Sequence, residues 1–257
     1  MSGSSLYKNG ILEGLRARGK GTPELFFYES ADSTNLRARE WARGGGGDAV
    51  FVAASQTAGR GRLGRSFLSA DGGIYVSFLV HPTEGLSSPS GITAEAAVKL
   101  CRAIERVTGI SADIKWVNDL YINGKKVAGI LTEGEFDENG FLRYYVVGMG
   151  INVYKIKDFD RVMPIATTLE DNAKCDININ DLCAEIITEL LSYTDPRELL
   201  DGYRERCFVV GREVTVLRGE KEYSARALSV TDDYSLEILT ESGERELLGS
   251  GEISLRL

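Results

Sequence analysis

Residues 114–131 read IKWVNDLYINGKKVAGIL, and this stretch decides the class of fold. Apolar side chains gather in the runs 114–116, 120–122 and 127–131, and Asn123-Gly124 separates the second run from the third. Asn-Gly between two apolar runs predicts a tight hairpin, because both residues tolerate a positive φ. The stretch therefore predicts neighbouring antiparallel strands.

Helical and strand-like periods alternate along the chain from about residue 25 to about residue 200. Ser33 can cap a helix that stops at the glycine run 44–47. Apolar residues recur at every fourth position from Ile92 to Ile104, so a second helix is expected to end before Gly109. Further strands are expected at 50–54, 73–80 and 144–147, and a further helix at 181–193. The pattern predicts a mixed α/β or α+β domain with several adjacent antiparallel strands.

The pattern changes after Pro196, where short apolar runs alternate with turn residues. Strands are expected at 214–217, 223–230, 236–240 and 246–248. About 50 residues of this kind predict a small all-β barrel. We therefore expect three parts: a polar N-terminal extension at 1–24, a larger domain at 25–205 and a small C-terminal domain at 206–257.

Composition excludes several classes of protein. The 257 residues include 30 Lys and Arg against 38 Asp and Glu, so the net charge of −8 argues against a generally basic nucleic-acid coat. No stretch approaches the roughly 18 consecutive apolar residues of a membrane span, and the N-terminus lacks the apolar core of a signal peptide. We therefore expect a cytoplasmic protein that does not bind membranes.

The cysteines and the histidine do not predict a metal site. The four cysteines lie far apart without the CxxC spacing of a zinc or redox motif, so we expect buried free thiols. The single histidine, His81, precedes Pro82 at the end of an apolar run. It is therefore expected to end a strand rather than to serve a catalytic triad.

The segment QTAGRGRLGR at 56–65 follows a predicted buried strand and is the strongest candidate for a ligand site. Its glycines, among them Gly59 and Gly61, let backbone N–H groups approach a ligand closely. Arg60, Arg62 and Arg65 add guanidinium groups that can bind phosphate in pairs of hydrogen bonds. Such a loop suits a polyanion such as ATP, although it has no GK[ST] ending. The alternative is a solvated surface loop or a nonspecific RNA contact.

The hairpin at 115–131 carries a second set of candidate residues. A lysine that faces an apolar sheet is costly unless it meets an anion, so Lys115 and Lys126 are candidates to hold a carboxylate beside a phosphate. Asn118 or Asp119 could hold Mg²⁺ through the phosphates. The alternative is a hairpin with exposed lysines. Trp116 is expected in the core rather than as a stacking platform.

Two further segments offer neutral hydrogen-bonding groups. Ser33, Thr34 and Asn35 can serve as a helix cap alone, or they can bind a neutral polar ligand such as a ureido ring together with Gln56. The segment at 148–153 reads GMGINV, and we expect its glycines to form a bend that leaves Asn152 free to contact the edge of a base.

Taken together and in this order, these motifs resemble those of the biotin protein ligases, which are also called biotin–acetyl-CoA-carboxylase ligases. The resemblance begins at Asp32 and runs to the C-terminus. It rests on STN at 33–35, QTAGRGRLGR at 56–65, KWVNDL at 115–120, KVAGIL at 126–131, GMGINV at 148–153, ATTL at 166–169 and SGEISLR at 250–256.

The resemblance implies a fold and a reaction. The fold is α+β, similar to class II aminoacyl-tRNA synthetases, with helices packed on a mixed or antiparallel sheet and an SH3-like barrel after it. In the reaction, biotin and Mg·ATP give biotinyl-5′-AMP, which then acylates one lysine of a biotin carboxyl carrier protein.

The resemblance also implies roles for individual residues. Ser33, Thr34, Asn35 and Gln56 surround the biotin ring system, and the loop from Gly59 to Arg65 closes over the adenylate. Arg60 and Arg62 stabilise charge, Lys126 holds the carboxylate and the adenylate, and Gly129 presents its backbone near the ligand. The nucleotide is bound by Arg65, Lys115, Asn118 and Asn152, and Asp119 is the candidate Mg²⁺ ligand.

Three residues depart from the usual family pattern: Val117 replaces proline, Leu63 stands where a basic residue is common, and Phe67 replaces tryptophan. About 24 residues before the catalytic domain cannot form a winged helix, so we expect no sequence-specific DNA binding. Exposed strand edges could pair two subunits. The alternatives are a lipoate or octanoate ligase, a noncatalytic RNA- or peptide-binding module, and a degenerate ligase that only sequesters biotin.

Overall fold

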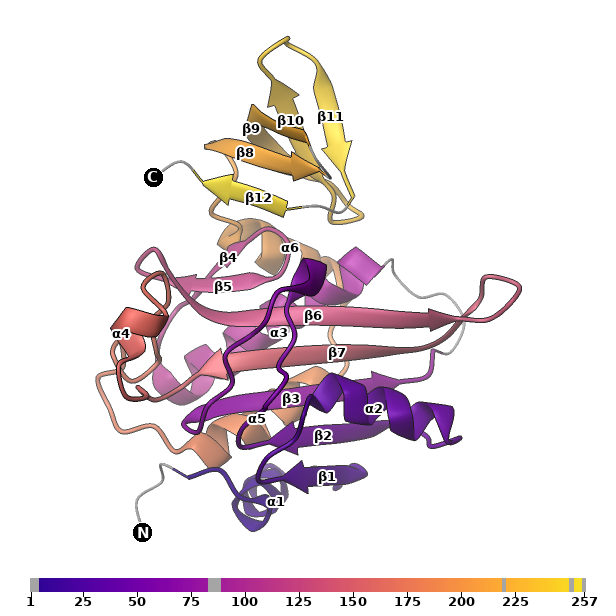
Figure 1. Cartoon of the computed structure of the whole chain (residues 1–257), viewed down its shortest axis with the longest axis vertical. Helices are drawn as coiled ribbons and strands as arrows, with labels where there is room; N and C mark the ends of the chain where they lie inside the picture. Colours follow the sequence, from indigo (N-terminus) through magenta and orange to yellow (C-terminus); the bar gives the residue numbers. More distant parts are fainter. Residues whose placement is uncertain (1–4, 83–88, 219–220, 250–251, 256–257) are drawn as a thin grey trace.

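The structure is a computed structural model that describes residues 5–82, 89–218, 221–249 and 252–255. Its larger sheet has seven strands in the order β1-β2-β3-β7-β6-β5-β4, with β1 parallel to β2 and the remaining pairs antiparallel (Figure 1). The α+β class is therefore confirmed. The strands are β1 (Leu25–Tyr28), β2 (Ala49–Ala53), β3 (Gly73–Val80), β4 (Asp113–Lys115), β5 (Asp119–Ile122), β6 (Lys125–Phe136) and β7 (Leu142–Asn152).

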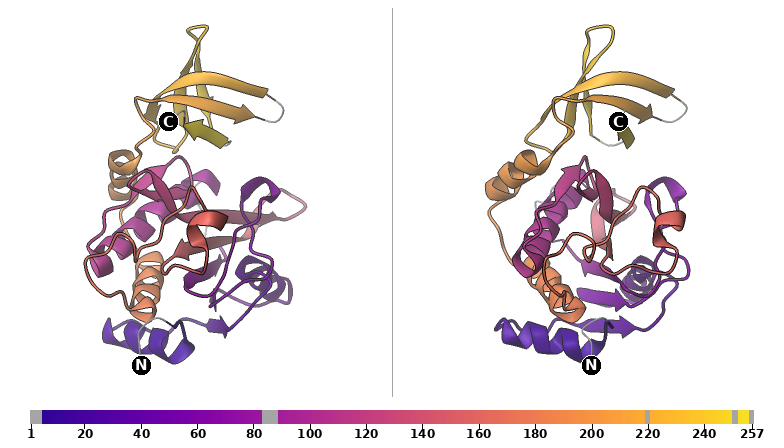
Figure 2. Two further views of the ribbon diagram at one scale, coloured as in Figure 1. Left: turned by 60° about the vertical axis from the view of Figure 1, so that its left-hand side comes forward. Right: turned by 90° about the vertical axis from the view of Figure 1, so that its left-hand side faces the viewer.

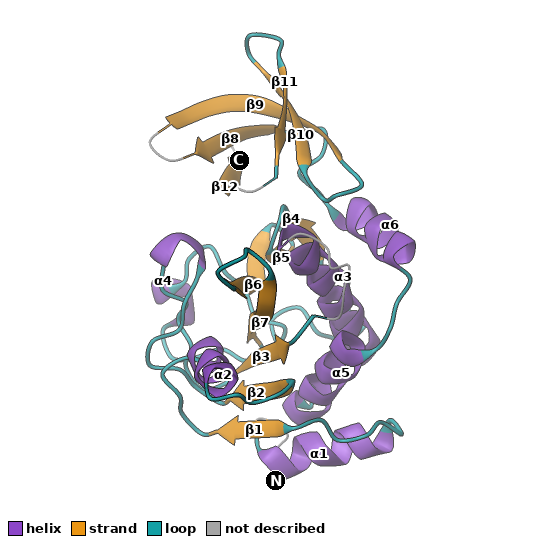
Figure 3. Ribbon diagram, turned by 90° about the vertical axis from the view of Figure 1, so that its right-hand side faces the viewer, coloured by secondary structure: helices purple, strands orange, loops and turns teal. Residues whose placement is uncertain are grey.

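Helices cover both faces of this sheet. In Figure 3, α3 and α5 lie on one side of the strands, and α2 lies on the other side. The helices are α1 (Lys8–Ala17), α2 (Thr34–Arg43), α3 (Pro89–Thr108), α4 (Phe159–Val162), α5 (Ile179–Leu191) and α6 (Pro196–Arg206). No helix in the described part of the chain is long and apolar enough to cross a membrane.

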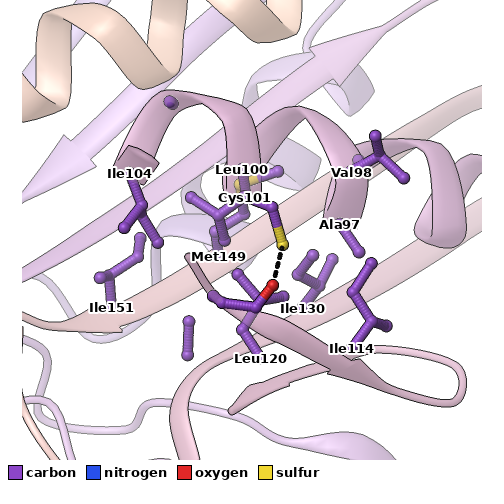
Figure 4. Close-up of a cluster of buried hydrophobic side chains, with 14 of the residues drawn as sticks. Ala97, Val98, Leu100, Cys101, Ile104, Ile114, Leu120, Ile130, Met149 and Ile151 are labelled. Carbon is purple, nitrogen blue, oxygen red and sulfur yellow. Dashed lines mark hydrogen bonds between the residues drawn. The ribbon is translucent and has the colours of Figure 1, made fainter. Parts of the chain in front are cut away.

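The largest hydrophobic core lies between α3 and the sheet. The predicted stripe on α3 is buried, and Figure 4 shows Leu100, Cys101 and Ile104 packed against side chains of the strands, including Ile130 and Met149. The Cys101 thiol donates to the carbonyl oxygen of Ala112 at 3.6 Å, and burial raises its pKa to about 12. Helices α3 and α5 thus cover one face of the sheet, and α2 lies on the opposite face.

The hairpin prediction is confirmed. Asn123 and Gly124 have φ values of 51° and 77°, which is the positive-φ pair that a tight two-residue turn needs. Strands β5 and β6 pair antiparallel across this turn, so that Asp119 lies opposite Gly129. The Trp116–Val117 peptide bond just before β5 is cis.

The prediction of a glycine bend after residue 147 is wrong. Gly148 and Gly150 lie inside β7 and pair in regular register with β3 and β6. A Cβ at Gly148 would collide with the Asn35 amide, and one at Gly150 would collide with the Phe67 ring. These glycines are therefore needed for the close approach of α2 and the 56–67 loop to the strand, not for a turn.

A helix that the sequence analysis did not predict covers one end of the domain. Within the segment 1–24, of which residues 1–4 are not described, α1 packs against α5 with Ile11 and Leu15 buried. Just beyond this helix, Arg18 donates to Glu185 on α5 at 2.5 Å. Elements β1, α4, α6 and β12 were also not predicted.

The five C-terminal strands form a second sheet in the order β11-β10-β9-β8-β12. Figure 2 shows this sheet beyond α6, at the end of the molecule opposite α1. Its strands are β8 (Glu213–Arg218), β9 (Lys221–Val230), β10 (Leu236–Thr240), β11 (Arg245–Leu248) and β12 (Glu252–Leu255). The predicted small β domain is thus confirmed. Of the motif at 250–256, residues 250, 251 and 256 lie outside the described residues.

A buried tryptophan joins the two sheets. Trp116 is 3% exposed, and its indole N–H donates to the carbonyl oxygen of Tyr234 at 2.9 Å. The expectation that Trp116 belongs to the core is therefore confirmed. Because Trp116 directly follows β4, this contact brings the second sheet to the edge of the hairpin.

The cysteine prediction holds for three of the four thiols. Cys101, Cys183 and Cys207 are buried, but Cys175 is exposed, because it lies in the loop before α5. His81 follows the end of β3 and contacts Asp48 at 2.8 Å, as expected for a strand-end residue. The described residues hold no cluster of three His, Cys, Asp or Glu side chains that could bind a metal.

The packing of α1 predicts the effect of truncating Leu15. Leu15→Ala should lower the free energy of unfolding by about 2–5 kcal/mol, because Leu15 is 1% exposed and its truncation leaves a cavity against α5. Leu191→Ala, at the exposed end of α5, should change it by less than about 0.5 kcal/mol. Denaturant unfolding measures both variants. Equal stabilities would mean that α1 does not pack on the domain.

Candidate active site

An open cavity of about 490 Å³ lies where the N-terminus of α2 and the 56–67 loop meet β6 and β7. Strands β6 and β7 form its floor, where Gly129, Gly148 and Gly150 let the side chains of Lys126, Asn35 and Phe67 lie close to the strands. Ten of the sequence-predicted site residues line it together: Ser33, Thr34, Asn35, Gln56, Arg60, Gly61, Arg62, Asn118, Lys126 and Gly129.

One end of this cavity is built from neutral polar groups. The backbone N–H of Thr34 donates to Gln56 Oε1 at 2.8 Å, and the Gln56 amide nitrogen donates to Ser69 Oγ at 2.9 Å. Thr34 and Asn35 are only 3% and 5% exposed, and both contact the buried hydroxyl of Ser77. This end can therefore hydrogen-bond an uncharged polar ring.

Ser33 occupies the N-cap position of α2, as predicted, but its side chain makes no capping hydrogen bond. It lines the cavity instead. The neighbouring Asp32 accepts from the Ser33 backbone N–H at 2.7 Å and from Arg37 Nε at 2.8 Å. The hydrogen bond from Arg37 holds the pKa of Asp32 below its ordinary value, so this carboxylate stays ionised beside the start of the helix.

The 56–67 loop folds back on itself over the cavity. Gly61 N–H donates to the carbonyl oxygen of Arg65 at 2.7 Å, and Phe67 N–H donates to that of Gly59 at 2.9 Å. A turn of 3₁₀ helix at Arg62–Gly64 forms the tip, where Leu63 has a φ of 54° and is 75% exposed. Gly59 lines neither cavity described here; a Cβ there would collide with Phe67 O and Ser69 Oγ, which explains its glycine.

The other end of the cavity is ionic. Lys126 Nζ lies 2.8 Å from Asp119 Oδ1 across β5 and β6, and its side chain is 27% exposed. Asn118 donates to the same oxygen at 3.0 Å and accepts from Arg62 Nη1 at 3.0 Å. The Asn118 amide therefore connects the arginine loop to the lysine of the hairpin.

A second open cavity of about 620 Å³ adjoins the first on the side of the C-terminal sheet. The two cavities share Gly61, Arg62, Phe67, Asn118 and Lys126. The residues that line only the second cavity include Leu63, Arg65, Lys115, Asp119 and Ile253. Four cationic side chains thus line the second cavity, which adjoins the ionic end of the first cavity and can attract an anionic ligand.

Asn152, like Gly59, is a candidate residue that lines neither of the two cavities. It ends β7 and is 7% exposed, and its amide nitrogen donates to the carbonyl oxygen of Thr167 at 3.3 Å. Its role toward adenine stays a prediction.

Sequence analysis missed several residues of the site. Ser77 lies within a strand read only as apolar, Met149 lies in the segment where a glycine bend was expected, and Phe67 was noted only as a departure from a motif. Ile253 comes from the far end of the chain, and no local pattern relates it to the hairpin. The glycine at position 148 is explained by Asn35, whose amide packs directly against it. This relation could not be predicted from the sequence, because it depends on how the strands pair.

Comparisons with known proteins agree with this geometry. Residues 31–152 match the model of the biotin/lipoate A/B protein ligase family, and residues 209–256 match the biotin protein ligase C terminal domain. A solved biotin protein ligase from Aquifex aeolicus, in complex with biotin and ATP, has a TM-score of 0.73 and 30% identity. That similarity covers 91% of this chain and 98% of the Aquifex chain.

Two curated relatives extend the comparison. The bifunctional ligase/repressor BirA of Bacillus subtilis is 38% identical over 172 residues, which are 65% of this chain and 52% of BirA. The biotin–[acetyl-CoA-carboxylase] ligase of Mycobacterium tuberculosis is 27% identical over 96% of this chain and 95% of its own length. The chain thus spans about half the length of its Bacillus relative.

The match over residues 31–152 places the chain among the biotin and lipoate protein ligases. Within that class, the chain belongs to the biotin protein ligase family.

The packing at Gly148 predicts a strict size limit. Gly148→Ala should lower the free energy of unfolding by about 1–3 kcal/mol, because the new methyl group must displace the buried Asn35 amide. Gly134→Ala on β6 is the matched control, since its methyl group would meet only flexible side-chain ends of Leu142 and Phe136. Denaturant unfolding compares the two; equal losses would contradict the close approach of α2 to β7.

Proposed function

We propose that the protein is an ATP-dependent biotin protein ligase. In the first step, a carboxylate oxygen of biotin attacks the α-phosphorus of ATP, forming biotinyl-5′-AMP as pyrophosphate leaves. In the second step, the amine of one lysine on a biotin carboxyl carrier protein attacks the biotinyl carbonyl carbon, and AMP leaves with the bonding electrons. Family membership supports the choice of acid, and the M. tuberculosis relative, a biotin–[acetyl-CoA-carboxylase] ligase, supports the choice of acceptor.

One observation carries the proposal: the two cavities meet at Arg62, Asn118 and Lys126. A ring bound at the neutral polar end of the first cavity directs its carboxylate toward this junction. A nucleotide in the second cavity brings its α-phosphate to the same junction from the other side. The reacting atoms would therefore meet where the two cavities share cationic side chains.

The chemistry requires positioning and charge stabilisation rather than a nucleophilic side chain. Lys126 would bind the carboxylate, and Arg60 and Arg62 would stabilise the negative charge that develops at the α-phosphate. Lys115 and Arg65 would neutralise the remaining phosphates. A folded loop above the site would also protect the mixed anhydride from water.

Mg²⁺ would enter with ATP. Phosphate oxygens and water would supply most of its ligands, with Asp119 as the protein carboxylate beside them. Both contacts of Asp119 given above use Oδ1, which leaves Oδ2 as the candidate ligand. The ion would reduce the charge of the phosphates.

The proposal is tested by measuring pyrophosphate release from Mg·ATP with biotin, lipoate or octanoate as the acid. Release that depends on biotin supports it. Release with lipoate or octanoate instead would assign the chain to a different substrate, and no release with any acid would contradict adenylation. Transfer is tested separately, by mass spectrometry of a biotin carboxyl carrier domain before and after incubation.

Arg62→Ala should reduce the rate of biotin-dependent pyrophosphate release by about 10²-fold, as expected for the loss of one charge-stabilising contact of about 3 kcal/mol. Its thermal unfolding should stay close to that of the native protein. Arg161→Ala removes an arginine that is 78% exposed on α4 and serves as the control for lost positive charge. A near-native rate for the folded Arg62 variant would refute the assigned role.

A further inference from the structure

A chain of hydrogen bonds runs behind the neutral polar end of the first cavity and ends on a carboxylate. Asn35 Nδ2 donates to Glu133 Oε2 at 2.8 Å, Ser77 Oγ lies 2.6 Å from Asn35 Oδ1, and Thr34 Oγ1 lies 2.7 Å from Ser77 Oγ. Thr34 and Asn35 line the cavity, whereas Ser77 and Glu133 lie behind it. The chain thus connects a cavity wall to a charged group that the ligand does not touch.

The Glu133 carboxylate is the nearer of two acceptors that orient the Asn35 amide; the carbonyl oxygen of Leu131 also accepts from Asn35 Nδ2, at 3.4 Å. An ionised carboxylate only accepts hydrogen bonds, so the amide nitrogen of Asn35 must face Glu133. Arg39, one helical turn after Asn35, holds Glu133 Oε1 at 3.2 Å, and both charged side chains are 24% exposed. The carbonyl oxygen of Asn35 must consequently face Ser77.

The direction of the remaining protons follows from this orientation. A serine hydroxyl has a single proton, and that of Ser77 goes to Asn35 Oδ1, which can only accept. The 2.7 Å contact between Ser77 and Thr34 then requires the hydroxyl proton of Thr34. Thr34 Oγ1 is therefore left with lone pairs and no proton for the cavity.

Gln56 presents a second acceptor beside it. Its Oε1 faces the donating backbone N–H of Thr34, and its Nε2 donates to Ser69 Oγ, whose proton goes to the carbonyl oxygen of Phe67. Gln56 Oε1 lies 3.1 Å from Thr34 Oγ1, and both atoms belong to residues that line the cavity. Two acceptors so close together favour a shared donor, such as an N–H group of a bound ring.

We propose that Glu133 is a positioning residue: through Asn35 and Ser77 it makes the Thr34 hydroxyl an acceptor, so that this wall selects a ring N–H. The inference rests on the proposed function, in which the ring is the ureido ring of biotin. Glu133 sets the hydrogen-bond direction of the wall without contacting the ligand.

Replacing the carboxylate by an amide should disturb this direction while preserving shape. In Glu133→Gln, a single carbonyl oxygen faces two donors, Asn35 Nδ2 and Arg39 Nη1. When Arg39 takes that oxygen, the new amide nitrogen faces Asn35. The Asn35 amide then turns over to accept from it, gives up its 3.4 Å hydrogen bond to the carbonyl oxygen of Leu131 and donates to Ser77. Ser77 then donates to Thr34, and the Thr34 proton points at Gln56 Oε1 or into the cavity.

Glu135→Gln is the matched control. Glu135 lies two residues further along β6 and also pairs with Arg39, at 3.4 Å, but its carboxylate makes no contact with Asn35 among those found in the described residues. The two variants therefore lose the same charge near the same arginine, and only one of them loses the carboxylate that orients Asn35.

The test measures the Kd of biotin and of two cyclic carbamate analogues, each with a different ureido N–H replaced by oxygen. The native protein and the Glu135 variant should bind biotin at least about tenfold more tightly than one of the two analogues. In Glu133→Gln this preference should fall about tenfold, because the wall no longer requires a donor. A merely structural defect would weaken all three ligands equally.

Ser77→Ala provides an independent variant, since it breaks the chain without changing Glu133 or Arg39. It should lose the same preference, and thermal unfolding verifies that each variant is folded. An unchanged preference in folded Glu133→Gln, or an equal loss in Glu135→Gln, would overturn the inference. If the native protein does not bind biotin, the proposed function itself fails.

Discussion

The ion pair between Lys126 and Asp119 is the interaction on which the site depends. A lysine at a half-buried position over a sheet is costly unless it meets an anion, and Asp119 supplies one at 2.8 Å from the neighbouring strand. The pair exists because the Asn123-Gly124 turn brings β5 and β6 together. Opposite Asp119 stands Gly129, where a Cβ would lie only 3.1 Å from Lys126 Nζ. The turn, Gly129 and the ion pair together place the ammonium group of Lys126 at the junction of the two cavities.

The two ends of the site differ in their interactions: one presents neutral hydrogen-bonding groups and the other presents charged groups. At the neutral end, the first residues of α2 present hydrogen-bonding groups to the cavity, because Gly148 in β7 admits them close to the sheet. At the ionic end, charge dominates, and the arginine loop reaches the hairpin through the amide of Asn118. The C-terminal sheet completes this end with Ile253, a position made possible by the contact between Trp116 and Tyr234. A single site is thus built from segments nearly the whole chain apart.

Local patterns predicted the parts of this protein that local physics determines. The Asn-Gly turn, the apolar stripe of α3 and the strand expected at 73–80 each depend on residues a few positions apart, and each was found in the structure. Local patterns failed where tertiary contacts determine the structure. Gly148 and Gly150 suggested a bend, but they allow close packing against a regular strand. The polar segment that contains α1 was not predicted to be helical, because its apolar face is defined only by packing against α5. Most candidate site residues converge on the two cavities, whereas Ser77 and Glu133 could not be predicted, because their partners lie on other elements.

We propose that the two adjoining cavities form one site for an acid and a nucleotide. The decisive measurement is a crystal structure with a nonhydrolysable biotinyl-adenylate mimic, in which a sulfamoyl group replaces the phosphate. We expect the ureido ring against Thr34 and Gln56, the linkage beside Arg62 and Lys126, and the nucleoside in the second cavity. A linkage away from Lys126, or a nucleoside outside the second cavity, would contradict it.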